Sequence, residues 1–288
     1  VKNLMSEKSS YLRISVCGLV FSGCFILAMP VPRYFFSLPG MFIVFSLVCP
    51  AIWLRLRDGI PATKTILVTA IPAGILATII GFQGLTAIPG PLGNLAGGAS
   101  TMILTVVYGG LLAIVAYALR DKSDREIPTV NLVTVLPCIL WMIFVLYFVL
   151  RYVSENVDLM TVSDYLSPKV FLLFVGINVL FKARGGLNNF ARILAESSIV
   201  GIMVCIVLAL VLWFRGLTEG TIPKDATDFA TLGLLYGTFL LMMSYYVSLL
   251  TGETDEINFD IKNWHLIELA ALYILLVFAP PSIFEIAE

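Results

Sequence analysis

The chain of 288 residues is 59% hydrophobic and only 13% charged, whereas charged residues make up roughly a quarter of an ordinary soluble domain. This composition excludes a water-soluble globular protein, and a formal net charge of -1 gives no sign of nucleic-acid binding. The segment 65–119 contains no Asp, Glu, Lys, Arg or His, and it is long enough for two membrane-spanning helices. The sequence therefore predicts a polytopic protein of the lipid bilayer.

The apolar runs are continuous rather than alternating, which favours helices over the strands of a membrane barrel. They predict an all-α, polytopic membrane helix bundle with eight or nine transmembrane helices. The sixth run is short between Lys169 and Lys182, and the ninth contains Glu268. The predicted spans are 14–32, 34–54, 65–86, 98–119, 129–150, 165–181, 197–214, 229–250 and 264–284.

The positive charges predict how these spans are oriented. With the N-terminus on the cytoplasmic side, 13 of the 18 Lys and Arg residues fall in cytoplasmic segments and 5 on the opposite side. Short loops on the cytoplasmic side carry such an excess of Lys and Arg. We therefore expect a multi-pass protein of the cell inner (cytoplasmic) membrane with a cytoplasmic N-terminus.

The sequence also contains an internal repetition. The segment 82–86 (FQGLT) recurs at 214–218 (FRGLT), and the Tyr-Gly pair at 108–109 recurs at 236–237. Each half holds four predicted spans, and an even number returns the chain to the same side of the membrane. The expected organisation is two parallel four-helix repeats, 1–125 and 126–256, followed by a C-terminal transmembrane or interfacial helix in 257–288.

The first of these hairpins resembles a known family. The segments 88–96 (IPGPLGNLA) and 104–110 (LTVVYGG), with Asp121-Lys122 just past the span, resemble the last hairpin of the MotA/TolQ/ExbB proton-channel family and are closest to MotA. The segment 38–44 (LPGMFIV) is similar to the entry of that family's second span. The resemblance implies the channel subunit of a proton-motive-force-driven complex, whose partner is a single-span membrane protein carrying an Asp.

The chain also departs from that family. The large cytoplasmic region by which MotA contacts the flagellar rotor is replaced by the short loop 55–64, so we do not expect torque on a rotor. Val106 stands where the family has the second Thr of a Thr-Thr pair, and Gly233 and Leu234 occupy both places in the second half. Because those hydroxyls belong to the family's ion path, the departures weaken the expectation of conduction, most of all for the second half.

The candidate pore or partner-contact residues are the polar and small residues of the two hairpins. For all of them, simple helix packing is the alternative interpretation. These residues are Thr78, Thr105, Tyr108, Gly109, Tyr236 and Gly237. A small-solute transporter with a cavity between the halves, and a non-transporting scaffold, are competing functions. A channel or a transporter would have Thr78, Thr105, Asn178, Ser197, Ser198 and Ser244 face one shared interior. A homo-oligomer is compatible with each function.

Glu268 is the one carboxylate predicted inside a span, so it is the candidate proton site. The alternative is that it reaches out to the membrane surface, where Trp264 and His265 would form an interfacial anchor. The five cysteines lie in apolar runs without metal-ligand or redox spacing. No catalytic motif is recognised, and we expect no enzyme activity, no catalytic or metal site and no cofactor.

Overall fold

The computed structural model describes residues 37–86, 92–119, 130–156, 166–185, 190–219, 224–252 and 254–278. All regular elements in these ranges are α-helices, which confirms the predicted all-α class. The predicted first span, 14–32, lies outside the described residues. The helices are α2 (Leu38–Val48), α3 (Pro50–Asp58), α4 (Ala62–Thr86), α5 (Leu92–Leu119), α6 (Leu132–Asn156), α7 (Pro168–Gly185), α8 (Phe190–Glu219), α9 (Lys224–Thr251) and α10 (Thr254–Phe278).

The predicted span 34–54 is two short helices instead of one. Ser37 caps α2, where its hydroxyl oxygen accepts a hydrogen bond from the N–H of Gly40 at 3.3 Å. Pro50 lacks an N–H and favours the first turn of a helix, so the chain ends α2 at Val48 and restarts as α3. Gly59, with a φ of 69°, then ends α3 in the left-handed conformation.

Six helical segments in the described part of the chain are long and apolar enough to cross a membrane. They are Leu38–Asp58, which joins α2 and α3, Ala62–Phe82, Met102–Leu119, Leu132–Tyr152, Phe190–Gly216 and Ala226–Thr251. α7, which corresponds to the predicted sixth span, is not among them, and Asn263–Phe278 of α10 is a shorter apolar helix. The helices are those of a multi-pass membrane protein that contacts the lipid bilayer.

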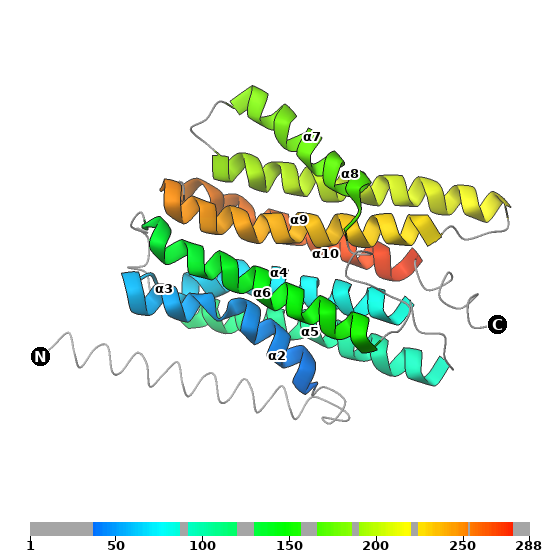
Figure 1. Ribbon diagram of the computed structural model, residues 1–288, viewed down its shortest axis with the longest axis horizontal. Helices are drawn as coiled ribbons and strands as arrows, with labels where there is room; N and C mark the ends of the chain where they lie inside the picture. Colours follow the sequence, from blue (N-terminus) through cyan, green and yellow to red (C-terminus); the bar gives the residue numbers. More distant parts are fainter. Residues whose placement is uncertain are drawn as a thin grey trace, which may run out of the picture.

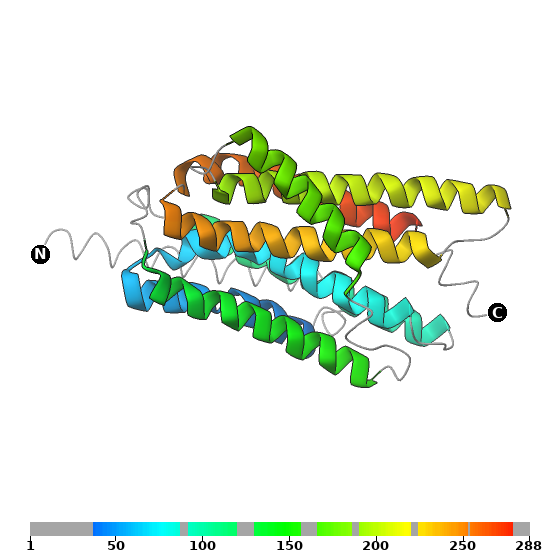
Figure 2. The same cartoon turned by 45° about the horizontal axis from the view of Figure 1, so that its top comes forward.

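Successive passes run in alternating directions, and α4 and α8 run the same way, as do α5 and α9 (Figures 1 and 2). The hairpins α4–α5 and α8–α9 are the most tightly packed pairs, and α4 and α9 pack against each other in the centre. α10 covers α8, α9 and part of α4, whereas α6 lies against α2, α3, α4 and α9. The core therefore lies around α4 and α9.

Two hydrogen bonds between residues far apart in the sequence tie α9 to earlier parts of the chain. The hydroxyls of Thr65 on α4 and Tyr245 on α9 are 3.0 Å apart and buried. At the start of α6, the N–H of Val130 donates to the carbonyl oxygen of Leu249 on α9 at 2.9 Å. Both bonds lie toward the end of the bundle where α9 finishes.

Candidate functional site

Two of the predicted pore residues, Thr78 on α4 and Thr105 on α5, meet in the interior. Their hydroxyl oxygens are 2.7 Å apart, and both side chains are buried. Each hydroxyl also lies 2.7–3.0 Å from the same two backbone carbonyl oxygens, those of Gly74 and Met102. The result is a closed cluster of two hydroxyls and two carbonyls that ties α4 to α5.

The distances within this threonine cluster are those of hydrogen bonds. Each hydroxyl oxygen lies within 3.0 Å of the other hydroxyl and of both carbonyl oxygens. Each hydroxyl has one proton, and carbonyl acceptors are already within reach of both. In this structure the pair acts as a helix–helix contact.

Tyr108 and Tyr236 make equivalent contacts in the two hairpins. The N–H of Ser37 donates to the hydroxyl of Tyr108 at 2.8 Å, and the N–H of Ser167 donates to that of Tyr236 at 2.9 Å. Ser37 immediately precedes α2, and Ser167 immediately precedes α7. Each tyrosine therefore binds one of the N–H groups that a helix start leaves without an intrahelical partner.

Gly109 and Gly237, which follow these tyrosines, lie where two helices come closest. A Cβ atom at Gly109 would collide with the carbonyl oxygen of Ala70 on α4. At Gly237 it would collide with the side chain of Ile202 and lie 3.1 Å from the carbonyl oxygen of Ser198 on α8. Small residues of this kind let membrane helices approach closely. Both glycines therefore act in packing, the alternative interpretation of their motif.

Glu268 and His265 form a buried pair one turn apart on α10. Glu268 is 0% exposed, and its Oε2 lies 3.0 Å from Nδ1 of His265, which is also buried. Glu268 Oε1 and His265 Nε2 are buried too, and neither has a hydrogen-bond partner among the described residues. Glu268 is enclosed by the bundle, and Trp264 and His265 are packed inside it as well.

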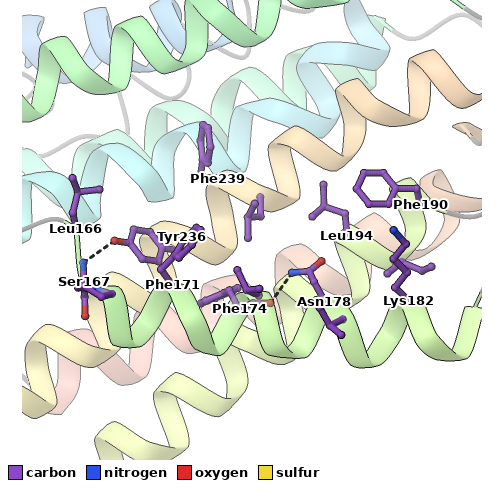
Figure 3. Close-up of a pocket in the computed structure, with 15 residues that line it drawn as sticks. Leu166, Ser167, Phe171, Phe174, Asn178, Lys182, Phe190, Leu194, Tyr236 and Phe239 are labelled. Carbon is purple, nitrogen blue, oxygen red and sulfur yellow. Dashed lines mark hydrogen bonds between the residues drawn. The ribbon is translucent and has the colours of Figure 1, made fainter. Parts of the chain in front are cut away.

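A groove of about 750 Å³ lies between α7 and the pair α8–α9 (Figure 3). Ser167 and Tyr236 lie at one end of it, and Lys182 and Phe190 lie at the other. Its walls are almost entirely apolar, including Phe171, Phe174 and Phe239. The groove belongs to the second half of the chain alone, so it is not the cavity between halves that a transporter would require.

The six polar residues expected to share one interior do not form a single cluster of hydrogen bonds. Thr78 bonds to Thr105, and the Ser197 hydroxyl donates to Asn178 Oδ1 at 2.7 Å. Ser198 and Ser244 donate to carbonyls of their own helices.

The bond between Thr65 and Tyr245 was not predicted from the sequence. Its one signal is that Tyr245 and Tyr117 follow Tyr236 and Tyr108 at the same spacing.

Comparisons of the chain with protein-family models, curated proteins and solved structures find no match. Within the described ranges, no group of three or more His, Cys, Asp or Glu side chains could hold a metal ion. The buried pair on α10 is therefore the arrangement in the described chain with the clearest potential for chemistry.

Proposed function

We propose that this integral membrane protein handles protons, with Glu268 and His265 as its protonatable site, and that it is not an enzyme. The observation that carries the proposal is the complete burial of Glu268 beside His265, with Oε1 and Nε2 lacking partners among the described residues. A charged side chain at mid-bilayer costs at least ~2.5–3.5 kcal/mol, so carboxylates retained inside membrane helices usually serve ion or proton movement.

The motif resemblance supports a more specific form of the proposal. The chain would be the channel-like subunit of a proton-motive-force-driven complex of the MotA/TolQ/ExbB type, completed by a single-span partner that carries an Asp. In that arrangement, the partner helix would pack near Thr105 and Tyr108. The partner would then supply a second carboxylate, and Glu268 would be the site that this chain contributes.

A duplicated architecture of two parallel four-helix repeats, 1–125 and 126–256, forms part of the proposal, with 257–288 as the C-terminal helix. It is supported by equivalent contacts. The tyrosine-to-serine bonds at the starts of α2 and α7 correspond at spacings of 128 and 130 residues in the sequence. The close approaches of Gly109 to Ala70 and of Gly237 to Ser198 correspond at a spacing of 128.

We further propose that the chain lies in the cell inner membrane with its N-terminus in the cytoplasm. The ends of α3, α5 and α7 and the starts of α4, α6 and α8, which flank the segments that the sequence assigns to the cytoplasm by their Lys and Arg, lie at the same end of the bundle (Figure 1). Single cysteines at Lys122 and Asp158 test this orientation in intact cells. An impermeant thiol reagent should label only the cysteine at 158, and equal labelling of both would contradict the topology.

Proton flux in liposomes tests the function. The purified chain, reconstituted with an internal pH dye, should show no flux alone, because the partner helix is needed for ion transfer; together with the single-span partner it should show flux that falls at least tenfold in Glu268→Gln. A matched control is Glu196→Gln, because Glu196 is a partly exposed carboxylate that pairs with Arg192 at 2.7 Å. Flux that survives Glu268→Gln, or falls equally in the control, would refute the assignment.

A non-transporting scaffold is the second candidate, and the threonine cluster favours it. The Thr105 hydroxyl, which the family resemblance places in an ion path, here lies at hydrogen-bond distance from Thr78 and from two backbone carbonyl oxygens. A scaffold predicts no flux from the chain under any condition. It also predicts that Glu268→Gln lowers only stability, which thermal unfolding of the purified protein in detergent would show.

A further inference from the structure

The central contact of the bundle joins a surface of the first repeat to a different surface of the second. α4 presents the side that carries Thr65, Pro72, Leu76 and Ile79, and α9 crosses it with Tyr245 against Thr65. The four positions on α4 are buried. On α9, the side that carries Tyr245 includes Thr231, Thr238 and Met242, which are buried as well. A contact between two unlike surfaces is heterologous.

The same two surfaces exist a second time, without each other. At the spacing of 128 residues given by the glycine contacts, the side of α4 corresponds to a valine stripe on α8, and the side of α9 corresponds to a stripe on α5. Val200, Val204 and Val207 correspond to Pro72, Leu76 and Ile79, and together with Val211 they form the valine stripe; Ile193, the counterpart of Thr65, is buried in the groove beside α7 and is not part of it. The α5 stripe is Ile103, Gly110, Ile114 and Tyr117. Both stripes repeat at helical spacing, so each forms one continuous side of its helix.

Side chains of these two stripes are more exposed than their counterparts on α4 and α9. Tyr117 is 60% exposed, whereas its counterpart Tyr245 is 2% exposed. Val207 is 57% exposed, whereas its counterpart Ile79 is fully buried. A Cβ atom at Gly110 would meet nothing within 4 Å, so another helix can approach α5 closely at that point.

Two repeats related by a two-fold axis would make both contacts inside one chain. Here the α4–α9 contact is made, and α5 and α8 lie on opposite sides of this central pair (Figure 1). The chain therefore makes one of the two equivalent contacts, and the α5 and α8 surfaces that would form the second do not meet within it. A heterologous surface left open at both ends of a molecule is completed by further copies.

We propose that this protein associates head to tail with copies of itself, with the α5 stripe of one copy packed on the valine stripe of the next. The contact reproduces the α4–α9 contact of the single chain and rests on the duplicated architecture proposed above. α4 and α9 are antiparallel, as are α8 and α5, so the two copies have the same orientation in the membrane. The antiparallel register of the Thr65–Tyr245 contact, carried over to α8 and α5, places Ile103 of one copy against Val207 of the next, and these side chains are 49% and 57% exposed.

Disulfide cross-linking in native membranes tests this contact. In a chain whose five native cysteines are replaced, the double variant Ile103→Cys with Val207→Cys should give dimers and larger species on oxidation. Each single variant alone should give none, because a heterologous contact brings neither position to its own copy. Ile143→Cys with Val207→Cys is the matched control, since Ile143 is an exposed residue of α6 outside both stripes, and it should remain monomeric.

Three outcomes would overturn the proposal: no dimers from the Ile103–Val207 pair, dimers from Ile103→Cys alone, or equal cross-linking of the Ile143 control. The intramolecular pair Thr65→Cys with Tyr245→Cys should cross-link without any gain in mass, which is read out by mass spectrometry of the linked peptides. Failure of that pair contradicts the central contact itself. The flux measurement with Glu268→Gln is independent of both pairs, so the proton-handling function stands or falls separately.

Discussion

The hairpins α4–α5 and α8–α9 share a backbone arrangement but are held together by different chemistry. In α4–α5, glycines lie on both helices: a Cβ at Gly74 would lie 2.6 Å from the carbonyl oxygen of Thr105, and one at Gly109 would meet Ala70. The threonine cluster adds hydrogen bonds to this contact. At the contact between α8 and α9, the closely packed glycines lie on α9 alone. Cβ atoms at Gly233 and Gly237 would collide with the side chains of Cys205 and Ile202.

The contacts that both hairpins share are the ones that this kind of helix pair requires. Both hairpins keep a glycine after the tyrosine and a tyrosine bond to a helix start, so these contacts set the spacing of the helices. The hydroxyl pair occurs in one hairpin only, since Ile206 and Gly233 stand at the corresponding positions. The threonine cluster is thus an addition to a packing scheme that works without it.

The largest effect should come from filling the closest approach. Gly109→Ala places a methyl group against the backbone of Ala70, which cannot rotate away, and it should lower the free energy of unfolding by roughly 1–3 kcal/mol. Gly237→Ala should cost less, because the atoms that its Cβ would meet within 3.0 Å belong to the side chain of Ile202 and not to a backbone. Reversible unfolding in mixed micelles, followed by tryptophan fluorescence, measures both.

Gly176→Ala is the control for this pair of variants. Gly176 lies on α7, and a Cβ there would meet nothing within 4 Å. Its replacement should leave stability unchanged or slightly raised, because Ala favours a helix over Gly by about 1 kcal/mol. Equal losses from Gly109→Ala and Gly237→Ala would show that the two hairpins tolerate crowding alike, contrary to the distinction drawn above.

An intermediate effect is expected from the threonine cluster. Thr78→Val and Thr105→Val keep the shape but remove a hydroxyl, and each should lower the free energy of unfolding by about 0.6–1.7 kcal/mol, the range found for hydrogen bonds between membrane helices. The double variant should cost less than the sum, since the two hydroxyls bond to each other. Thr69→Val, whose hydroxyl bonds only to Thr65 O of its own helix, should change less, and strict additivity of the cluster variants would argue against a coupled pair.

The smallest effects should be the two tyrosine variants, and they should be equal. Tyr108→Phe and Tyr236→Phe each remove one acceptor from a helix-starting N–H, at 2.8 and 2.9 Å respectively. Each should lower the free energy of unfolding by about 0.5–1.5 kcal/mol, and the two losses should add because the sites are separate. Unequal losses measured in the same micelles would break the correspondence between the halves.

The helical class and the multi-pass character could be predicted from the sequence because continuous apolar runs leave no other backbone arrangement in lipid. The positions of Tyr108, Gly109 and their counterparts could also be predicted, since repeated sequence implies repeated local contacts. The break between α2 and α3 was missed, because hydropathy averages over Cys49 and Pro50 and does not register a change of helix axis.

The candidate site was harder to predict for a physical reason. Whether Glu268 faces lipid, water or protein depends on how α10 is rotated about its axis, and this is set by contacts with α4, α8 and α9. A single charge in an apolar helix carries no information about that rotation. The same limit applies to Thr78 and Thr105, whose pairing follows from the register between α4 and α5.

The hydrogen bond between Thr65 and Tyr245 has a consequence for how the protein is made. These residues are 180 positions apart in the sequence. A ribosome adding 5–20 residues per second needs roughly 10–35 seconds to deliver α9 after α4. During that time, the side of α4 that carries Thr65, Pro72 and Ile79 is in the membrane without the helix that covers it. Some other component, lipid or the insertion machinery, must shield the Thr65 hydroxyl until synthesis reaches the eighth predicted span.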